Sequence, residues 1–591
     1  MSYLRLLAIG TASLLVVAAC SETENAVEVA VEKTENSLFD YVPSDTPYLA
    51  GNLEPTPDEV IDVFLQRFAP VLKSVQNALV NARQELEAEA TVADETAAHD
   101  DDGSRLVNAI LQELDGKLNR QGMESLGFDL SSHKVVYGMG VFPVMRVGLS
   151  DADALRATIQ RVLANAEISA PELEHQGISY WRLSAGDTAD APVGMYVSIF
   201  TDHLAMSIFP PMAESQLLSA FLGLEMPGDS NAATRLAELN ARHNYTSYGS
   251  GILDLDRLVE EFINPNTIIA QVMATVGDFD PAEMAPECVS EIRGIVGNTP
   301  RMTVGTQELT TSAIAIQYRV ETKTTLAQQL AGLMTNIPVA SPLSDRLLEF
   351  SFGMRFGAVR DFLREKAVAI MEGPYQCEHF QSINESARDA FAKLNQPMPP
   401  LVNNFRGLRL SLSEITQTDS MPVNGHGLIA VHVDQPEMFV GMARMFLPDL
   451  SELTLAPGDP PVRLPASMIP MPDIIAFAAL SDEAIGLAIG DGEEVGLPAY
   501  LEEEAGPAGT FMSIGYDTAA YLEYTRELGK QFEQIEDEFS ATAPEQEATV
   551  QSIQEISQSV QQAMMSFSDR TYTTFRFTPE GFEANSRMTF K

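Results

Sequence analysis

The chain has 591 residues, of which 83 are acidic and 37 basic, so its formal net charge at pH 7 is −46. A field of this sign repels nucleic acid and anionic membrane surfaces, and neither is expected as a partner. Hydrophobic residues make up 45% of the chain, which is typical of a globular protein and excludes a wholly disordered one.

Residues 1–19 have the pattern of a signal peptide. Arg5 supplies the positive charge, a short apolar stretch follows, and small residues precede Cys20. The apolar stretch is too short to span a bilayer comfortably. The sequence VAAC at residues 17–20 resembles the bacterial lipobox, in which the cysteine receives diacylglycerol before cleavage. This resemblance implies a lipoprotein attached to the membrane at Cys20. The alternative is a plain signal peptide followed by a chance cysteine.

The residues after Cys20 bear on where the protein is held. Ser21 in place of Asp resembles the default for export to the outer membrane in Gram-negative lipoproteins. Residues 21–37 contain five glutamates and one lysine, which predicts a solvated tether within the segment 20–37. At about 5–6 Å × √n, this tether would hold the folded body about 20–25 Å from the bilayer. We therefore expect an outer-membrane lipoprotein whose body faces the periplasm.

The folded part is expected to form two α+β halves, residues 38–340 and 341–591, because one hydrophobic core cannot serve a chain of this length. A helix is predicted to begin after Thr56, where a capping hydroxyl precedes a proline in the first turn. Residues 99–103 are predicted to be an acidic loop. Read as an EF-hand, this loop lacks the required carboxylates, so we expect no calcium site.

The order of predicted elements repeats along the chain, which indicates an internal duplication. In each half, a strand, an acidic turn and a second strand are followed by a helix or helix-like segment (196–208 with 212–222, and 475–489 with 492–504). A strand and a helix precede each hairpin (144–149 with 153–166, and 427–433 with 436–446). Another strand and helix follow it (248–253 with 256–262, and 510–516 with 519–532).

Each half is expected to close on a two-stranded ribbon, because apolar and polar residues alternate over 302–308 with 314–320 and over 572–577 with 582–590. Strands that turn back between helices predict an α+β fold, with antiparallel sheets covered by helices on one face. Near the end of the chain, 519–539 and 545–565 are predicted to form a helical hairpin.

Cys288 and Cys377 are the cysteines left after lipidation, and a periplasmic compartment permits a disulfide between them. Such a bridge would staple the halves near their junction and would stabilise the fold by at most about 4–5 kcal/mol. Two buried free thiols are the alternative. A metal site is not expected, because His379 lies near Cys377 without a second pair of ligands at zinc spacing.

The motifs of catalysis are weak. Ser131 and Lys134 match Ser-x-x-Lys but lack the partner motifs, and the Gly-Ser-Gly around Ser250 lacks the spacing of a nucleophile elbow. His426 and His432 could share one strand face without a third ligand. No phosphate-binding or dinucleotide motif is present, and no cofactor is expected. Carboxylates are too abundant for a glycosidase pair to be located by spacing.

Two stretches carry a further resemblance. Residues 41–48 (YVPSDTPY) and 137–147 (YGMGVFPVMRV) resemble an uncharacterised family of proteobacterial envelope proteins. The resemblance implies a periplasm-facing lipoprotein with a duplicated α+β body, and it transfers no catalytic residue. Arg146, a charge in an otherwise apolar strand, is the single charge that we select for testing. An exposed position on the strand is the alternative.

These patterns favour a non-catalytic lipoprotein that binds, assembles or scaffolds an envelope protein or lipid. The alternative is a periplasmic hydrolase whose carboxylate site has no recognisable spacing. A deep cleft with two close acids would favour the hydrolase, and an apolar groove between the halves would favour the binding protein.

Overall fold

The structure is a computed structural model, and it describes residues 37–69, 73, 102–117, 119–184, 193–277, 279–341, 344–418, 421–446, 448–469, 474–523 and 565–591. The signal peptide, Cys20 and the tether lie outside the described residues, as does most of the predicted helical hairpin. Among the described helices, none combines the length and the apolar character that crossing a bilayer requires.

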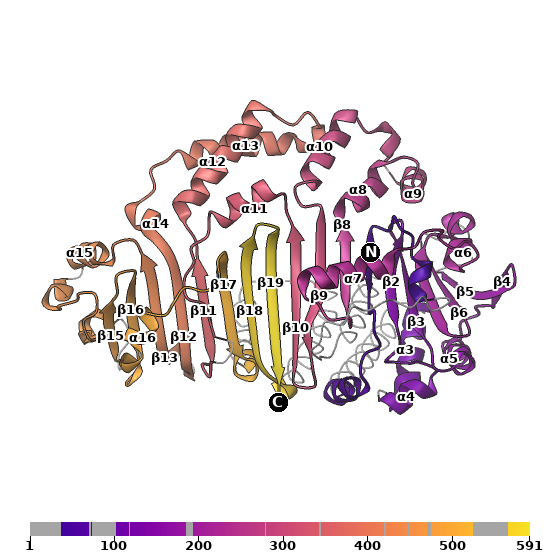
Figure 1. Ribbon diagram of the computed structural model, residues 1–591, viewed down its shortest axis with the longest axis horizontal. Coiled ribbons are helices and arrows are strands. Elements are labelled where there is room, and N and C mark those ends of the chain that lie inside the picture. Colours follow the sequence, from indigo (N-terminus) through magenta and orange to yellow (C-terminus); the bar gives the residue numbers. More distant parts are fainter. Residues whose placement is uncertain are drawn as a thin grey trace, which may run out of the picture.

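The described strands form one antiparallel sheet of 19 strands that runs through the whole molecule (Figure 1). From one edge to the centre, the strands are β4 (Leu173–His175), β5 (Ile178–Ser184), β6 (Gly194–Ile199), β7 (His203–Phe209), β3 (Phe142–Gly148), β2 (Lys134–Met139), β1 (Tyr48–Gly51), β8 (Ser250–Asp254), β9 (Arg301–Leu309) and β10 (Ala313–Glu321).

From the centre to the other edge, the strands are β19 (Gly581–Phe590), β18 (Ser568–Thr578), β17 (Thr510–Asp517), β11 (Leu348–Gly353), β12 (Phe405–Thr418), β13 (Met421–Val433), β16 (Ala484–Ile489), β15 (Ala476–Leu480) and β14 (Val462–Arg463). Read from edge to centre, the order β5-β6-β7-β3-β2-β1-β8-β9-β10 of the first half therefore matches, strand for strand, the order β14-β15-β16-β13-β12-β11-β17-β18-β19 of the second half.

The centre of the sheet corrects one expectation. The pairs β9–β10 and β18–β19 form in the predicted register regions, but they are not terminal ribbons of two separate sheets. Instead, β10 and β19 pair with each other over nine residue positions from Ala313 to Glu321. This pairing gives both strands a neighbour on each side and removes two edges that would otherwise expose unpaired backbone groups.

The two faces of the sheet differ in their residues. Face A carries Gln317 and face B carries Tyr318, which is its neighbour in β10. Directly paired residues share a face, and side chains alternate between faces along each strand. In β12, for example, Leu408 and Leu410 lie on face B whereas Arg409 lies on face A.

Helices pack on the sheet through four buried clusters. The helices involved include α3 (Asp102–Leu114), α5 (Ala152–Asn165), α6 (Glu214–Phe221), α7 (Ala232–His243), α16 (Leu497–Leu501) and helical residues 58–69. In the first half, face A packs against α6 and α7, and face B packs against α5. Helices thus cover both faces there, which corrects the expectation of cover on one face only.

In the second half, α16 covers face A of β13, β15 and β16, where Leu497 and Leu501 contact small residues of the strands. At the centre, helical residues 58–69 pack on face B beside Phe567 and Phe590. The prediction of an acidic loop over residues 99–103 is also partly wrong, because Asp102 and Gly103 already belong to α3.

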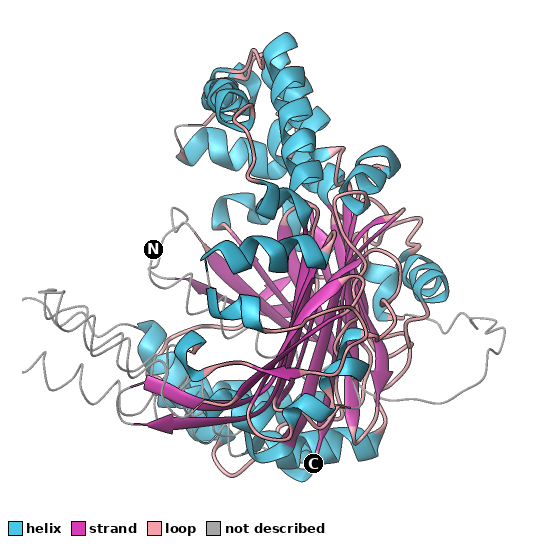
Figure 2. Ribbon diagram, turned by 90° about the vertical axis from the view of Figure 1, so that its left-hand side faces the viewer, coloured by secondary structure: helices cyan, strands magenta, loops and turns pink. Residues whose placement is uncertain are grey.

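A group of helices lies along one end of the central strands and rises above the sheet (Figures 1 and 2). The first half contributes α8 (Leu255–Ile263), α9 (Ile268–Val276) and α10 (Pro286–Val296). The second half contributes α12 (Phe356–Glu372), α13 (Gln381–Leu394) and α14 (Pro400–Asn404), and α11 (Thr324–Ala331) lies between these helices and the sheet. The two sets of helices are joined covalently by the disulfide between Cys288 and Cys377.

Candidate functional site

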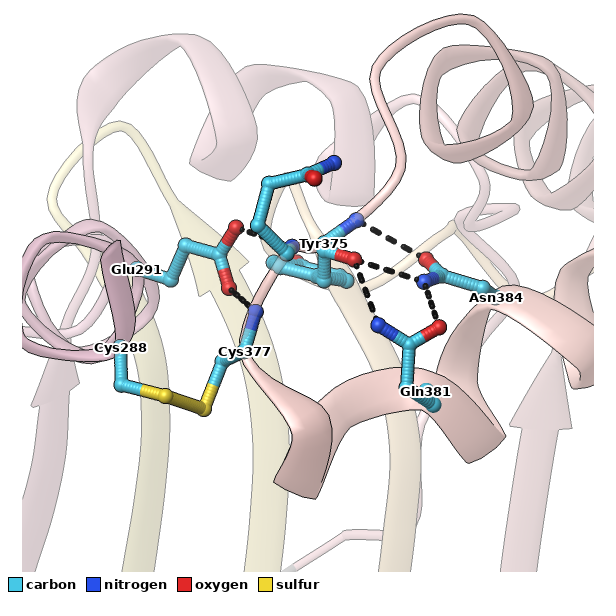
Figure 3. The surroundings of a disulfide bond; sticks show 7 residues. Cys288, Glu291, Tyr375, Cys377, Gln381 and Asn384 are labelled. Atoms are coloured by element: carbon cyan, nitrogen blue, oxygen red, sulfur yellow. Dashed lines mark hydrogen bonds between the residues drawn. A yellow bond between two sulfur atoms is a disulfide. The ribbon is translucent and has the colours of Figure 1, made fainter. Parts of the chain in front are cut away.

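Cys288 and Cys377 form a disulfide with an S–S distance of 2.06 Å, in agreement with the bridge predicted from the sequence. Cys288 lies on α10, and Cys377 precedes the short 3-10 helix that leads into α13 (Figure 3). Both cysteines are buried. The bridge therefore joins a helix of the first half to a loop of the second half.

Polar contacts position that loop on α10 independently of the sulfur atoms. The Glu291 carboxylate, one helical turn after Cys288, accepts hydrogen bonds from the backbone amides of Gln376 at 2.7 Å and Cys377 at 3.0 Å. On the other side of the loop, the Asn384 side chain accepts from the Tyr375 amide at 2.9 Å and donates to its carbonyl at 2.9 Å (Figure 3). The disulfide is thus a structural staple in an ordered setting.

Arg146, the charge selected from the sequence, is fully buried at 0% exposure, so the alternative of an exposed strand position is wrong. Its Nε donates to the Tyr137 hydroxyl at 3.1 Å, and one terminal nitrogen donates to the Phe221 carbonyl at 2.6 Å. Phe221 is the last residue of α6, and cations are stabilised at helix C-termini. The Tyr41 ring lies over the guanidinium at 3.8 Å. Arg146 is therefore held by neutral groups.

His203 completes this cluster. The other terminal nitrogen of Arg146 lies 2.9 Å from His203 Nε2, and His203 Nδ1 lies 2.7 Å from an Asp202 carboxylate oxygen. A guanidinium can only donate, so Nε2 must accept and Nδ1 must carry the hydrogen that is donated to Asp202. Burial lowers the pKa of His203, as does Arg146, although the hydrogen bond to Asp202 opposes the shift. The imidazole is therefore neutral in this arrangement.

The second half has a comparable buried arginine. Arg409 on β12 donates to the Tyr500 carbonyl in the last turn of α16 at 2.6 Å, and the Tyr500 ring lies 3.9 Å from the guanidinium carbon. Its other terminal nitrogen forms an ion pair with Glu503. His432 is buried nearby, and burial together with Arg409 lowers the pKa of His432 to about 4.

One row of directly paired residues on face A connects the two arginines. The row begins at Arg146 and ends at Arg409, and its members are Arg146, Val135, Gly51, Ser250, Gly305, Gln317, Asn585, Thr574, Ser513, Ser351 and Arg409. At its centre, Gln317 donates to Asn585 at 2.6 Å, where the two halves meet. We call these residues the polar row.

The weak catalytic motifs occupy structural positions. Lys134 donates to the Leu130 carbonyl at 2.6 Å, and the Ser131 hydroxyl donates to Asp129 at 2.7 Å, so the two do not contact each other as a nucleophile and base would. Burial lowers the pKa of Lys134 to about 8. Ser250 lies in β8 on the polar row, away from any strand-to-helix elbow. Within the described residues, no three His, Cys, Asp or Glu side chains cluster as metal ligands would.

Face B carries a second row with the opposite character. From β9 to β15 its members are Val304, Tyr318, Ala584, Phe575, Met512, Phe352, Leu408, Val431, Ile485 and Leu480. All of them are uncharged, and every one except Leu480 is partly or fully exposed. We call these residues the apolar row.

An aromatic cluster lies beside the apolar row at the centre of the sheet. The Phe577 ring lies 5.3 Å from Phe511 and 5.7 Å from Phe582, and Phe582 lies 6.2 Å from Phe575. At the first-half side of this cluster, Tyr318 is 50% exposed and Met302 is 40% exposed. The cluster, the apolar row and the neighbouring large side chains on face B of β11, β12 and β17 together form a continuous apolar surface, which we call the apolar platform.

The platform belongs mainly to the second half. On face B, β11, β12 and β17 present nine large side chains, and all nine are partly exposed: Leu348, Phe350, Phe352, Leu408, Leu410, Leu412, Met512, Ile514 and Tyr516. The corresponding strands β1, β2 and β8 of the first half present mostly small or polar residues, and Leu253 is the one leucine among them: Tyr48, Ala50, Lys134, Val136, Gly138, Gly251 and Leu253. A continuous apolar surface that solvent reaches is a candidate interaction site.

Comparisons with protein-family models, with curated proteins and with solved structures found no match. The candidate site therefore rests on the geometry alone. Sequence reasoning selected Arg146 and the disulfide but missed the platform. The alternation of residues in the strands signalled one apolar face, but it did not show that the large side chains of this face would be partly exposed.

Proposed function

We propose that this protein is an outer-membrane-anchored periplasmic lipoprotein with a non-catalytic binding or scaffold role, and that the apolar platform is its binding surface. The observation that carries the proposal is the inverted burial of the second half. On β11, β12 and β17, small and polar residues of face A, such as Ser351 and Ser513, are buried, whereas the large apolar residues of face B are partly exposed. Burying such apolar area drives association.

The first half supports a protein partner over a lipid. There, α5 packs on face B of β5 to β7, with Leu155 and Leu163 against Trp181 and Val197. Among the described residues, an amphipathic helix therefore covers face B of these strands. We propose that a helix of an envelope protein docks on the apolar platform in the same way.

We also propose that the two halves arose by duplication. The repeated order of strand pairing supports this proposal. So does the centre of the sheet, where Gln317 of β10 faces Asn585 of β19 and each lies two positions from an arginine, Arg319 and Arg587. A duplicated frame of this length gives a scaffold one continuous surface on which to present a partner.

The buried carboxylate of the central strands does not favour the hydrolase alternative. The most deeply buried carboxylate on the central strands is Glu583, at 2% exposure. Arg319 contacts it at 2.7 Å, and Arg576 donates to it at 2.6 Å. With one arginine on each of its oxygens, this carboxylate has a structural role.

Photo-crosslinking in cells tests the proposed function. A photoreactive residue in place of Tyr318, which is 50% exposed on the platform, is compared with one in place of Val495, which is 80% exposed outside it. We expect a discrete protein adduct at position 318 only, and we expect Phe575→Ser to abolish it. Equal adducts at both positions, or an adduct that survives Phe575→Ser, would contradict the proposal. A lipid adduct at position 318 would show that the platform binds a lipid and not a protein.

A further inference from the structure

The first described segment of the chain is packed onto the Arg146 cluster. Residues Leu38–Tyr41 form a 3-10 helix whose Leu38 and Phe39 are buried, and Val42 after it is 0% exposed. The Tyr41 ring covers the guanidinium of Arg146 and lies 5.3 Å from the His203 ring. The N-terminal segment is therefore the lid of a buried cationic cluster.

Core packing of Leu38, Phe39 and Val42 also holds this lid, but the hydrogen bond beneath Tyr41 depends on the protonation of one nitrogen. Nε2 of His203 accepts the hydrogen bond from Arg146 at 2.9 Å. A proton on Nε2 would remove that acceptor and place a second positive charge at hydrogen-bond distance from a guanidinium at 0% exposure. The cluster in its present form therefore excludes the imidazolium.

The charged and titratable groups around His203 come from four elements. Asp202, whose side chain is 66% exposed, hydrogen-bonds Nδ1 and favours the imidazolium. Arg146 on β3 opposes it directly. Tyr137 on β2 is uncharged, because burial raises its pKa. Tyr41 on the lid also has a raised pKa, with burial as the main cause. The local balance is thus between an exposed anion and a buried cation.

We propose that Asp202, His203, Arg146 and Tyr41 form an acid-sensitive latch that holds the N-terminal segment on the first half. Protonation of His203 breaks its hydrogen bond to Arg146. The guanidinium and the imidazolium then separate, and the Tyr41 ring loses the flat cationic surface on which it packs.

Contacts further along the chain limit how far the segment opens. The Ser44 carbonyl accepts a hydrogen bond from Arg257 at 2.8 Å. Thr46 donates to the Gly138 carbonyl at 2.9 Å and accepts from the Gly138 amide at 3.0 Å. Release therefore stops at Ser44, which leaves β1 paired on both sides.

The consequence for anchoring rests on the proposed lipid anchor, whereas the latch itself does not. Residues 37–43 would join the tether on release. At about 3.3–3.6 Å per extended residue, they would add at most about 25 Å to its reach. Acid would then let the body move farther from the membrane without unfolding it.

Hydrogen–deuterium exchange of the full chain at pH 7.5 and pH 5.0 tests the latch, with protection factors corrected for the intrinsic effect of pH. We expect protection of residues 38–42 to fall about tenfold or more at pH 5.0, because each pH unit below the free histidine pKa can shift the equilibrium tenfold. His203→Gln keeps an acceptor for Arg146 but cannot titrate, and we expect it to stay protected at both pH values. His432→Gln, a buried histidine of the second half, serves as the matched control and should respond as the wild type does.

Equal protection of residues 38–42 at the two pH values in the wild type would overturn the proposal. An acid response of His203→Gln equal to that of the wild type would overturn it too, since another group would then be responsible. If His203→Gln folds poorly, an NMR titration of the wild-type imidazole decides the matter. The proton must enter Nε2 with the same midpoint as the loss of protection, and a different midpoint would refute the latch.

Discussion

Arg146 and Arg409 end the same polar row, yet the two halves neutralise them differently. Both guanidiniums lie against a tyrosine ring, and both donate to a carbonyl in the last turn of a helix that follows a hairpin. Arg146 has three neutral partners and is 0% exposed, whereas Arg409 has a carboxylate partner and is 3% exposed. The halves thus share a frame but differ in how they compensate a buried charge.

The exposure of the partners indicates which of the two arginine sites tolerates substitution better. Glu503 is 51% exposed, so water shares in the compensation of Arg409. The Arg146 cluster has no such route, because Tyr137 and His203 are 0% and 2% exposed. In such a buried network, the loss of one partner leaves a charge or polar group unsatisfied where water cannot replace it. The first half should therefore be the more sensitive to substitution.

The largest expected effect is the loss of each arginine. Arg146→Ala leaves a cavity and three unpaired buried groups, and we expect it to lower the free energy of unfolding by about 3–5 kcal/mol. Arg409→Ala should cost less, because Glu503 can be hydrated. Urea unfolding followed by circular dichroism measures both midpoints. A larger loss for Arg409→Ala would break the comparison.

Much of the fold could be predicted from the sequence because it is encoded locally. The period-two alternation in 302–308 and 582–590 identified strands that the structure contains. The union of the halves could not be predicted, because the pairing of Gln317 with Asn585 joins strands separated by most of the second half. Alternation states that a strand has an apolar face, and it does not choose the partner strand.

The site shows the same limit. Arg146 was selectable because a charge is unusual in an apolar strand, but its burial depends on Tyr41, His203 and Phe221, which reach it from distant segments. The apolar platform was not predictable, since the exposed fraction of a large side chain depends on which helices pack nearby. Both features are decided by tertiary contacts.

A second prediction concerns pH and separates the two histidines. The pKa of His432 falls from 6.5 to about 4 in the folded protein, so the unfolded state binds more protons between these values. The contribution of His432 to the free energy of unfolding is therefore fully present above pH 6.5. It falls by about 3 kcal/mol as the pH decreases toward 4.

Urea midpoints between pH 7.5 and 4 measure this loss. His432→Gln should make the urea midpoint depend less on pH and should leave the acid-induced loss of protection in residues 38–42 unchanged. His203→Gln should abolish that loss of protection. If His432→Gln has the same slope as the wild type, the acid sensitivity belongs to other groups.

The smallest expected effects come from the neutral and charged partners themselves. Tyr137→Phe removes the acceptor of Arg146 Nε in a place that water does not reach, and we expect a cost of about 1–3 kcal/mol. Glu503→Gln keeps an oxygen that can accept from Arg409 and loses an ion pair that water screens, so we expect a cost of about 1 kcal/mol or less. Urea midpoints at pH 7.5 measure both variants, and 1 M salt should reduce the cost of Glu503→Gln only. A cost for Glu503→Gln that exceeds the cost of Tyr137→Phe would show that the ion pair, rather than the neutral cluster, is the more demanding way to hold a buried arginine.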